Sequence, residues 1–455
     1  MPIKPIDIKR FNALAAHTRS PAAAYISQEL QWFSNDTETL LGVLLLDTVD
    51  DDFVGVILGR DEGGKFRCID VASSIPTAEE AASWIERAIG WHGRDFDKVF
   101  PQGQTSKQLD LFTPIVPVEK LHPSFAKLCQ LNAFAPARQQ ITEIMPHYVD
   151  VDGNFIEQFQ TGGFDARLWE LYLHSYLVEE QLFLNQDFNR PDFLVTKYGK
   201  SVAIEATIVG RRPDRPSSYF RSSPFDSLPA DEDEVKRRQA HEIPIRFGSS
   251  LFSKLQKRYW ELEHVKGIPL VFAIADFHDD QAMLWTSTAL LNYLYGVRHD
   301  FHFDDNKQLV ITPIKIETHK VGDKEIPSGF FFQPDAQHVS AVIFSTSGTI
   351  SKFSRMGRQA GFKADNVIMM RYGTRHDHNP NANLPLPFTY MVDETCTETW
   401  AEGLSMFHNP RALHPVPQEL FPSIAHHRFK DGQIISHLPE FHPYASQTMH
   451  FNITK

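Results

Sequence analysis

The pattern of hydrophobic and polar positions just after residue 160 predicts a helix. Leu168, Tyr172 and Tyr176 lie at helical spacing, and Asp165 is a candidate N-cap because it follows two glycines. Glu170 interrupts this apolar pattern, because it shares a stripe of the helix with Leu173 and Leu177, three and seven residues later. A carboxylate at such a position either lies at the edge of the core or has a chemical use.

Two apolar, β-branched runs follow the helix, at residues 192–196 and 201–208, with a Tyr-Gly pair between them. A two-residue turn that contains glycine is typical of a β-hairpin. Counting outwards from that turn puts Asp192 directly opposite Glu205. Directly paired residues point to the same face of the sheet with Cβ atoms roughly 5 Å apart. We therefore expect the two carboxylates to lie side by side.

Two like charges on one face repel each other unless a cation lies between them. Mg²⁺ is commonly held by one or two carboxylates, and waters and substrate phosphate complete its coordination. The pair Asp192 and Glu205 therefore predicts a site for Mg²⁺, or for Mn²⁺, at the open end of the hairpin.

A second amphipathic helix and a further strand are predicted after the hairpin. Residues 249–262 carry a stripe of Phe252, Leu255 and Tyr259, with one of the two serines at its start as N-cap. Residues 270–275 form an apolar run of strand length. The order helix, hairpin, helix, strand follows from these patterns without reference to the carboxylates.

Three short segments resemble the PD-(D/E)XK nuclease superfamily in residue type and order: Glu170, Pro191-Asp192 and Glu205-Ala206-Thr207. The resemblance covers about residues 164–276, a minority of the chain. It implies that Asp192, Glu205 and the backbone carbonyl of Ala206 hold the metal ion and that Glu170 orients a metal-bound water. The chain departs from the family pattern at Thr207, because the family has lysine there.

In the family that lysine orients or activates the attacking water and stabilises developing charge. Some members of the superfamily supply the lysine from the following helix instead. In this chain the following helix carries Lys254 and Lys257, which are three residues apart and project from one side, with Arg258 beside them. The resemblance therefore implies a catalytic role for Lys254 as first choice and for Lys257 as the alternative.

Each of these features also has an ordinary structural explanation. Pro-Asp at a strand start is common turn chemistry, and a Glu-Ala-Thr tripeptide occurs by chance in many chains. On this explanation Glu170 is a snorkelling side chain, and the two lysines belong to a solvated helix face. The nuclease interpretation is favoured because all the features occur together and in the family's order.

The first 112 residues predict a separate α/β unit. We expect a helix at 22–33, strands at 39–47, 53–58 and 66–71, and then a helix from Thr77, where Glu80 completes a capping box. This unit has no constellation of chemical residues, and its candidate roles are contact with a protein partner or a second copy of the chain, or substrate sensing. Residues 113–160 predict a helical connector, with helices within 125–144.

After residue 300 the pattern predicts an α/β extension. Strands are expected at 309–318, 329–333, 339–345 and 366–372, and the Pro-rich sequence from Asn379 is typical of an extended tail. The strand at 339–345 leads to small polar residues at 346–349, which form a turn or, alternatively, bind phosphate through their backbone N–H groups. Lys352, Arg355 and Arg358 follow them. His376 and His378 have a metal-ligand spacing but no evident third ligand.

Composition and charge limit the classes of function. The longest apolar run, at residues 40–46, is too short to cross a bilayer, and the N-terminus lacks a signal-peptide pattern. We therefore expect no membrane partner. Three widely separated cysteines fit a reducing cytoplasm. A net charge of -12 excludes indiscriminate nucleic-acid binding, although residues 197–258 carry thirteen basic and eight acidic side chains.

The sequence therefore predicts an α/β protein whose core is a mixed-sheet, nuclease-like domain with flanking helices. The expected domains are an N-terminal unit at 1–112, a connector at 113–160, the core at 161–300 with an exposed insertion at 210–244, and an extension at 301–455. The expected activity is metal-dependent hydrolysis of phosphodiester bonds in nucleic acid, in DNA rather than RNA. The alternatives are a nuclease fold without catalysis that binds nucleic acid or a protein, and an interaction protein with no nucleic-acid role.

Overall fold

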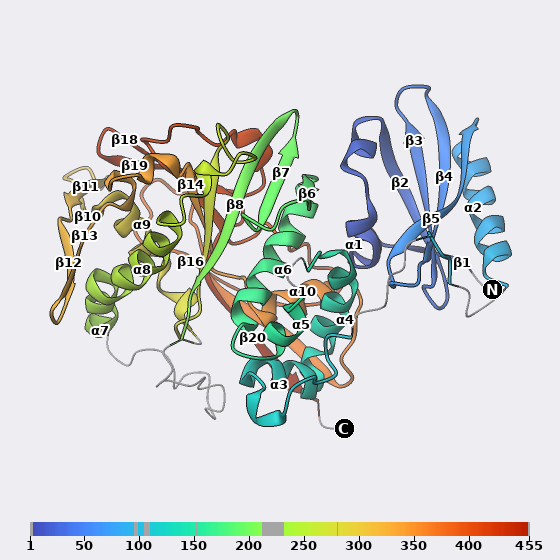
Figure 1. The fold of residues 1–455 in the computed structure, drawn as a ribbon, viewed down its shortest axis with the longest axis horizontal. Helices are drawn as coiled ribbons and strands as arrows, with labels where there is room; N and C mark the ends of the chain where they lie inside the picture. The colour runs from blue at the N-terminus through green and yellow to red at the C-terminus, as the bar shows by residue number, and fades with distance from the viewer. Residues whose placement is uncertain are drawn as a thin grey trace.

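A mixed eight-stranded sheet forms the centre of the protein, in the order β19-β18-β17-β14-β9-β8-β7-β6 (Figure 1). This computed structural model describes residues 3–94, 99–103, 110–150, 153–211, 232–279 and 281–453. The strands are β6 (Phe183–Asn185), β7 (Phe193–Lys197), β8 (Lys200–Val209), β9 (Leu270–Asp276), β14 (Ala341–Ser345), β17 (Leu404–His408), β18 (Ala425–Lys430) and β19 (Gln433–His437). Strands β8, β9 and β14 are parallel neighbours, and antiparallel strands flank them on both sides.

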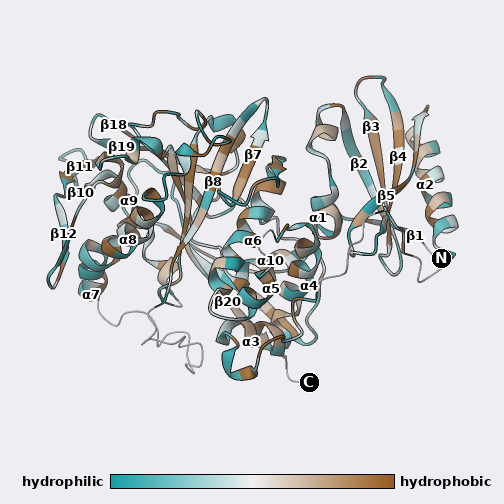
Figure 2. Cartoon of the chain, viewed as in Figure 1, coloured by the Kyte–Doolittle hydropathy of each residue, from teal (hydrophilic) through white to brown (hydrophobic). Residues whose placement is uncertain are grey.

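Helices cover both faces of this sheet, which confirms the predicted α/β class. One face packs against α6 (Phe164–Glu179) and α10 (Ile350–Gln359), together with the shorter helices α3 (Pro123–Gln130), α4 (Ala135–Ile144) and α5 (Phe155–Gln160). The other face packs against α8 (Ile243–Leu255) and α9 (Ser287–Tyr295). Figure 2 shows hydrophobic residues along the central strands and on the helices that cover them.

The β7–β8 hairpin has the predicted register. Lys197 pairs with Lys200 across the turn, and Phe193 pairs with Ile204 at the other end. Phe193 and Ile204 belong to the core on the α6 side, whereas their neighbours Leu194 and Ala203 belong to the core on the α8 side. This alternation follows from the two-residue period of a strand that is buried on both faces.

The N-terminal residues form a five-stranded antiparallel sheet with consecutive strand order. Its elements are β1 (Ile3–Ile6), α1 (Ile8–Ala15), β2 (Ser27–Asn35), β3 (Leu40–Asp47), β4 (Asp52–Arg60), β5 (Phe66–Ile75) and α2 (Ala78–His92). The three predicted strands and the capped helix are confirmed, since the Thr77 side chain accepts a hydrogen bond from the Glu80 N–H at 3.2 Å. The helix predicted at 22–33 is wrong, because β2 pairs there with both β1 and β3 and this tertiary pairing overrides local propensity.

The C-terminal half corrects the predicted organisation. Strands β14, β17, β18 and β19 belong to the central sheet, so this sheet does not end near residue 300 and the region after Asn379 is not an extended tail. A separate three-stranded sheet contains β15 (Val367–Arg375), β16 (Leu386–Met391) and β20 (Pro443–Asn452). The expected strand at 329–333 is wrong as well, because Phe330–Phe332 forms a 3-10 turn whose buried phenylalanines pack under α9.

The remaining elements are two short ribbons and the helix that precedes α8. The ribbons pair β10 (Val297–Phe303) with β11 (Leu309–Lys315), and β12 (Thr318–Val321) with β13 (Lys324–Pro327). Helix α7 (Glu232–Arg237) lies within the predicted insertion, and residues 212–231 of that insertion are outside the described residues. Among the described helices, none has the length and apolar character needed to span a membrane.

Candidate active site

The open end of the β7–β8 hairpin brings Asp192 beside Glu205. Asp192 immediately precedes β7, one step beyond the pair of Phe193 with Ile204, so the register places it opposite Glu205. Its Oδ2 accepts a hydrogen bond from the backbone N–H of Ala206 at 2.7 Å. The neighbouring strand therefore holds the Asp192 carboxylate in position.

Asp192 is exposed to solvent but closely surrounded by protein, as expected for a side chain in a recess. Burial among these protein atoms raises its pKa to about 8, and the nearby carboxylates of Glu205 and Glu170 add to this increase. The hydrogen bond from Ala206 and the charge of Lys254 act in the opposite direction. The site therefore holds more negative charge than the protein alone compensates.

Glu205 lies deeper and is only 4% exposed. Its Oε1 accepts hydrogen bonds from the Lys254 ammonium group and from the Tyr259 hydroxyl, the latter at 2.6 Å. Both donors come from the chain that covers the α8 side of the sheet: Lys254 from the last turn of α8, and Tyr259 from the turn after it. A cation from the following helix thus reaches the strand carboxylate.

Glu170 approaches the same site from α6. Its Oε2 accepts hydrogen bonds from the Tyr148 hydroxyl at 2.8 Å and from the Arg167 guanidinium at 2.6 Å. Burial raises the pKa of Glu170, although Arg167 and Tyr148 stabilise its charged form. Glu170 also raises the pKa of Asp192 by charge repulsion, so the three carboxylates form one electrostatic group.

The donor set at this site fits a divalent cation. When all three carboxyl groups are ionised, two cationic side chains contact them, Lys254 and Arg167, so one negative charge has no contacting cation. Among the described residues, Oδ1 of Asp192 and Oε2 of Glu205 have no hydrogen-bond partner. Hard oxygen atoms with excess negative charge are what Mg²⁺ and Mn²⁺ prefer.

The backbone of Ala206 can contribute a further oxygen. The backbone groups of successive strand residues point to opposite neighbouring strands. Ala203 and Val209 form hydrogen bonds on the β9 side. Ala206 lies an odd number of residues from each, so its N–H and C=O point to the other side, towards Asp192. Across the described ranges no group of three or more His, Cys, Asp or Glu residues is arranged to hold a metal ion. A bound ion would therefore depend on Asp192, Glu205 and the Ala206 carbonyl.

The two predicted lysines have different positions. Helix α8 begins at Ile243, six residues before the predicted start, and ends at Leu255. Lys254 therefore lies in its last turn and contacts Glu205, whereas Lys257 lies beyond the helix end and is exposed. Of the two, Lys254 alone belongs to the site.

The earlier start of α8 also corrects the predicted stripe and cap. Phe247, Leu251 and Leu255 follow each other at four-residue steps and are buried against the sheet, so Phe252 points away and is 51% exposed. The predicted serine cap is wrong, because Ser250 lies within the helix and donates a hydrogen bond to the Ile208 carbonyl at 3.0 Å. Asp165 is likewise not a cap, since it lies inside the first turn of α6.

Three contact residues of the site were not predicted: Arg167, Tyr148 and Tyr259. Arg167 precedes Glu170 by three residues, and helical spacing of opposite charges is a signal that could have identified it. Tyr259 was expected only as a core residue. Tyr148 lies 22 residues from Glu170 on a separate turn, and no local pattern marks it.

The other predicted chemical residues have structural contacts. Lys352 and Arg355 are buried and bind Glu398, so neither is exposed to a phosphate. The ring of His376 contacts the Tyr444 hydroxyl at 2.7 Å, and His378 contacts the Glu440 carbonyl at 3.0 Å. These contacts support the turn interpretation of the first segment and account for both histidines.

No protein-family model matches this chain, and no curated protein or solved structure does so either. The resemblance to PD-(D/E)XK nucleases therefore depends on the residues and contacts described above.

Proposed function

We propose that this protein is a metal-dependent nuclease that hydrolyses phosphodiester bonds in nucleic acid, with DNA as the substrate to test first. One observation carries the proposal: Lys254 from α8 binds Glu205, while Asp192 on the adjoining strand stays accessible. A purely structural ion pair does not need a second, accessible carboxylate beside it. Strongly perturbed carboxyl groups that face solvent are typical of catalytic sites.

In this proposal Asp192, Glu205 and the carbonyl of Ala206 hold Mg²⁺ or Mn²⁺. The ion, when bound, lowers the pKa of a coordinated water and stabilises negative charge on the phosphate. Lys254 donates a hydrogen bond to the attacking water or to the leaving oxygen, replacing the lysine that is absent at Thr207. Tyr259 fixes the rotamer of Glu205 through its 2.6 Å hydrogen bond.

Glu170 has a separate role in the proposal. Tyr148 and Arg167 both bind its Oε2, which holds the carboxylate in one orientation at the edge of the site. From there Glu170 accepts a hydrogen bond from the attacking water and orients it. This arrangement follows the general rule that a positioned base is itself held by a further group.

A second candidate function is nucleic-acid binding or protein binding without catalysis. Thr207 favours it, because the strand position that carries the family's lysine is occupied by a residue that cannot supply a positive charge. The engagement of Lys254 with Glu205 is compatible with both functions. A protein or homodimer contact through the N-terminal sheet and a cytoplasmic location complete the proposal, and the three unpaired cysteines agree with a reducing compartment.

The test is cleavage of single-stranded and double-stranded DNA by the purified full-length protein with Mg²⁺, Mn²⁺ or EDTA. Asp192→Asn and Glu205→Gln should each lower the cleavage rate by about 10³-fold or more, and Lys254→Ala by about 10²–10⁴-fold. Lys257→Ala is the matched control, since it removes a lysine three residues away and should leave the rate unchanged. Undiminished cleavage by Asp192→Asn would refute the site, and a wild-type protein that binds but never cleaves would establish the second function.

A further inference from the structure

The loop that leads into Asp192 presents an exposed aromatic ring four residues before this carboxylate. Phe188 lies in the loop between β6 and β7 and is 39% exposed. One face of its ring stacks on His264, with ring centroids 3.8 Å apart and planes 8° from parallel. His264 also contacts the Arg190 carbonyl at 2.6 Å through its Nε2. These contacts fix both the ring and the loop.

Arg190 is the second feature of this loop. It is exposed, and among the described residues its guanidinium has no hydrogen-bond or ion-pair partner. It lies two residues before Asp192. Burial and Glu205 raise the pKa of Tyr259, and the charge of Arg190 acts in the opposite direction, as expected for a guanidinium near the hydroxyl bound to Glu205. A free guanidinium beside a carboxylate site is suited to a phosphate oxygen, which it can bind through two parallel hydrogen bonds.

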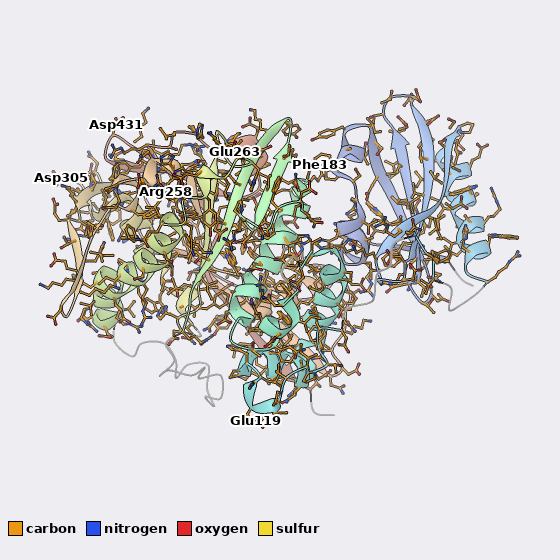
Figure 3. All side chains as sticks on the ribbon, in the orientation of Figure 1. Glu119, Phe183, Arg258, Glu263, Asp305 and Asp431 are labelled. Carbon is orange, nitrogen blue, oxygen red and sulfur yellow. The ribbon has the colours of Figure 1, made fainter. Side chains whose placement is uncertain are left out.

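A hollow adjoins the loop on the outer side of the sheet. It has a volume of about 480 Å³ and is lined mainly by polar residues: Phe183, Leu184, Asn185, Gln186, Asp187 and Thr196. Thr196 shares a sheet face with Asp192, because the two residues are separated by an even number of positions along the same extended segment. Phe183, labelled in Figure 3, projects from the edge strand that forms one wall. The hollow therefore opens at the edge of the sheet, next to the start of the loop that carries Phe188.

These features, taken with the proposed nuclease function on which this inference rests, define the class of substrate. We infer that the protein binds single-stranded nucleic acid, with an unpaired base stacked on the exposed side of Phe188 and a phosphate at Arg190. A base inside a duplex already stacks on its neighbours, so an exposed phenylalanine can add a stacking contact only to an unpaired base. Stacking is also tolerant of sequence, since every base has a flat π-face.

The charge of the chain supports the same conclusion. With a net charge of -12, the protein gains little from long-range attraction to a phosphate backbone. Binding must then come from local contacts, and stacking on an aromatic ring contributes about 1–3 kcal/mol per base, which corresponds to roughly 5- to 150-fold in affinity. One stacked base and one paired phosphate would thus account for most of the binding at this loop.

The experiment measures binding without cleavage. Fluorescence anisotropy of a labelled oligodeoxythymidine strand and of a duplex of equal length is followed in EDTA with full-length protein. Phe188→Ala should weaken single-strand binding about tenfold and leave duplex binding unchanged, and Phe188→Trp should restore it. Arg190→Ala should weaken binding several-fold and reduce the slope of log affinity against log salt by about 0.7.

Matched controls come from the β10–β11 ribbon, where Phe301 is 53% exposed and the Arg298 side chain 55% exposed. Phe301→Ala and Arg298→Ala should leave both affinities unchanged. Wild-type protein that binds no single strand, or Phe188→Ala and Arg190→Ala variants that bind like wild type, would overturn the inference. If cleavage still depends on Asp192, the proposed nuclease function survives that failure. A wild-type protein that binds through Phe188 but never cleaves would instead overturn the nuclease function and leave this inference intact.

Discussion

Two clusters of five charged side chains have opposite ratios of acidic to basic groups and differ in their access to solvent. The site cluster joins three carboxylates to two cations: Glu170, Asp192, Glu205, Arg167 and Lys254. The buried cluster joins three cations to two carboxylates: Lys352, Arg355, Arg371, Glu398 and Glu402. The site cluster opens to solvent at Asp192, whereas every side chain of the buried cluster is at most 13% exposed.

The two clusters shift carboxyl pKa values in opposite directions. Burial alone would raise the pKa of Glu398, but the charges of Arg355, Arg371 and Lys352 outweigh burial and hold it well below its usual range. At Asp192, burial and neighbouring carboxylates act together and raise the pKa to about 8. Removing a buried carboxylate that is surrounded by cations leaves those cations unpaired, so such a carboxylate is costly to lose. A carboxylate that is repelled by its neighbours costs stability and is retained where it has a chemical use.

The largest effect on stability is expected in the buried cluster. Glu398→Ala should lower the free energy of unfolding by about 3–5 kcal/mol, because it leaves buried cations without their main partner. Urea denaturation measures this, with Glu394→Ala as control, since Glu394 lies four residues away and is exposed. A stability close to that of the control would show that the buried cluster is not the structural counterpart of the site.

A somewhat smaller effect is expected from metal binding to the site cluster. Mg²⁺ or Mn²⁺ at about a hundredfold excess over its dissociation constant should stabilise the wild-type protein by about 2.7 kcal/mol. Thermal unfolding with and without the ion measures this, and Asp192→Asn and Glu205→Gln should abolish the shift while Glu394→Gln retains it. An equal shift in all four proteins would mean that the ion binds elsewhere.

Most of the structure around the site was predictable because it depends on local pattern. A two-residue turn and a period of two fix the β7–β8 register, so the Asp192–Glu205 pairing followed from the sequence. The strand at Leu270–Asp276 was predictable from its continuous apolar run of strand length. In contrast, β17 and β18 are short strands within a Pro-rich region. The place of β17 in the sheet depends on pairing with β14 some 60 residues earlier, and β18 joins the sheet by pairing with β17.

The site itself was only partly predictable, because some of its contacts join residues that lie far apart in the sequence. The two hairpin carboxylates and Lys254 lie on elements with a clear pattern. The sequence pattern places the start of α8 too late because Pro244 resembles a loop residue, although proline is well accommodated in a first helical turn. Tyr148 contacts Glu170 through tertiary packing alone, so no periodicity could have revealed it.

The pH dependence of stability should distinguish the site cluster from the rest of the protein. The pKa of Asp192 is about 8 in the folded state and about 4 in the unfolded chain, so its favourable contribution is complete below about pH 4 and is lost as pH rises through about 8. Discounted for solvent screening at an exposed carboxyl, the loss should be about 1–2 kcal/mol. Urea denaturation at pH 4, 6 and 8 measures this loss of unfolding free energy. The Asp192→Asn variant should not show the part of the loss that comes from Asp192.

Other buried carboxyl groups also titrate in this range, since burial raises the pKa of Glu179 to about 7. The informative quantity is therefore the difference between wild type and Asp192→Asn at each pH. A difference that stays constant from pH 4 to pH 8 would mean that Asp192 is not repelled by its neighbours, and the contrast between the two clusters would then disappear.

The smallest effect is expected at Tyr148, whose hydroxyl donates a 2.8 Å hydrogen bond to Glu170. Tyr148→Phe should cost about 1 kcal/mol of stability, because Arg167 still binds the same carboxylate oxygen and its charge remains paired. If Glu170 orients the attacking water, the variant should also lower kcat several-fold with little change in KM, as kinetics on single-stranded DNA would measure. Loss of stability with unchanged kcat would instead assign Glu170 to the structure, which would leave the hairpin carboxylates and Lys254 as the whole of the catalytic site.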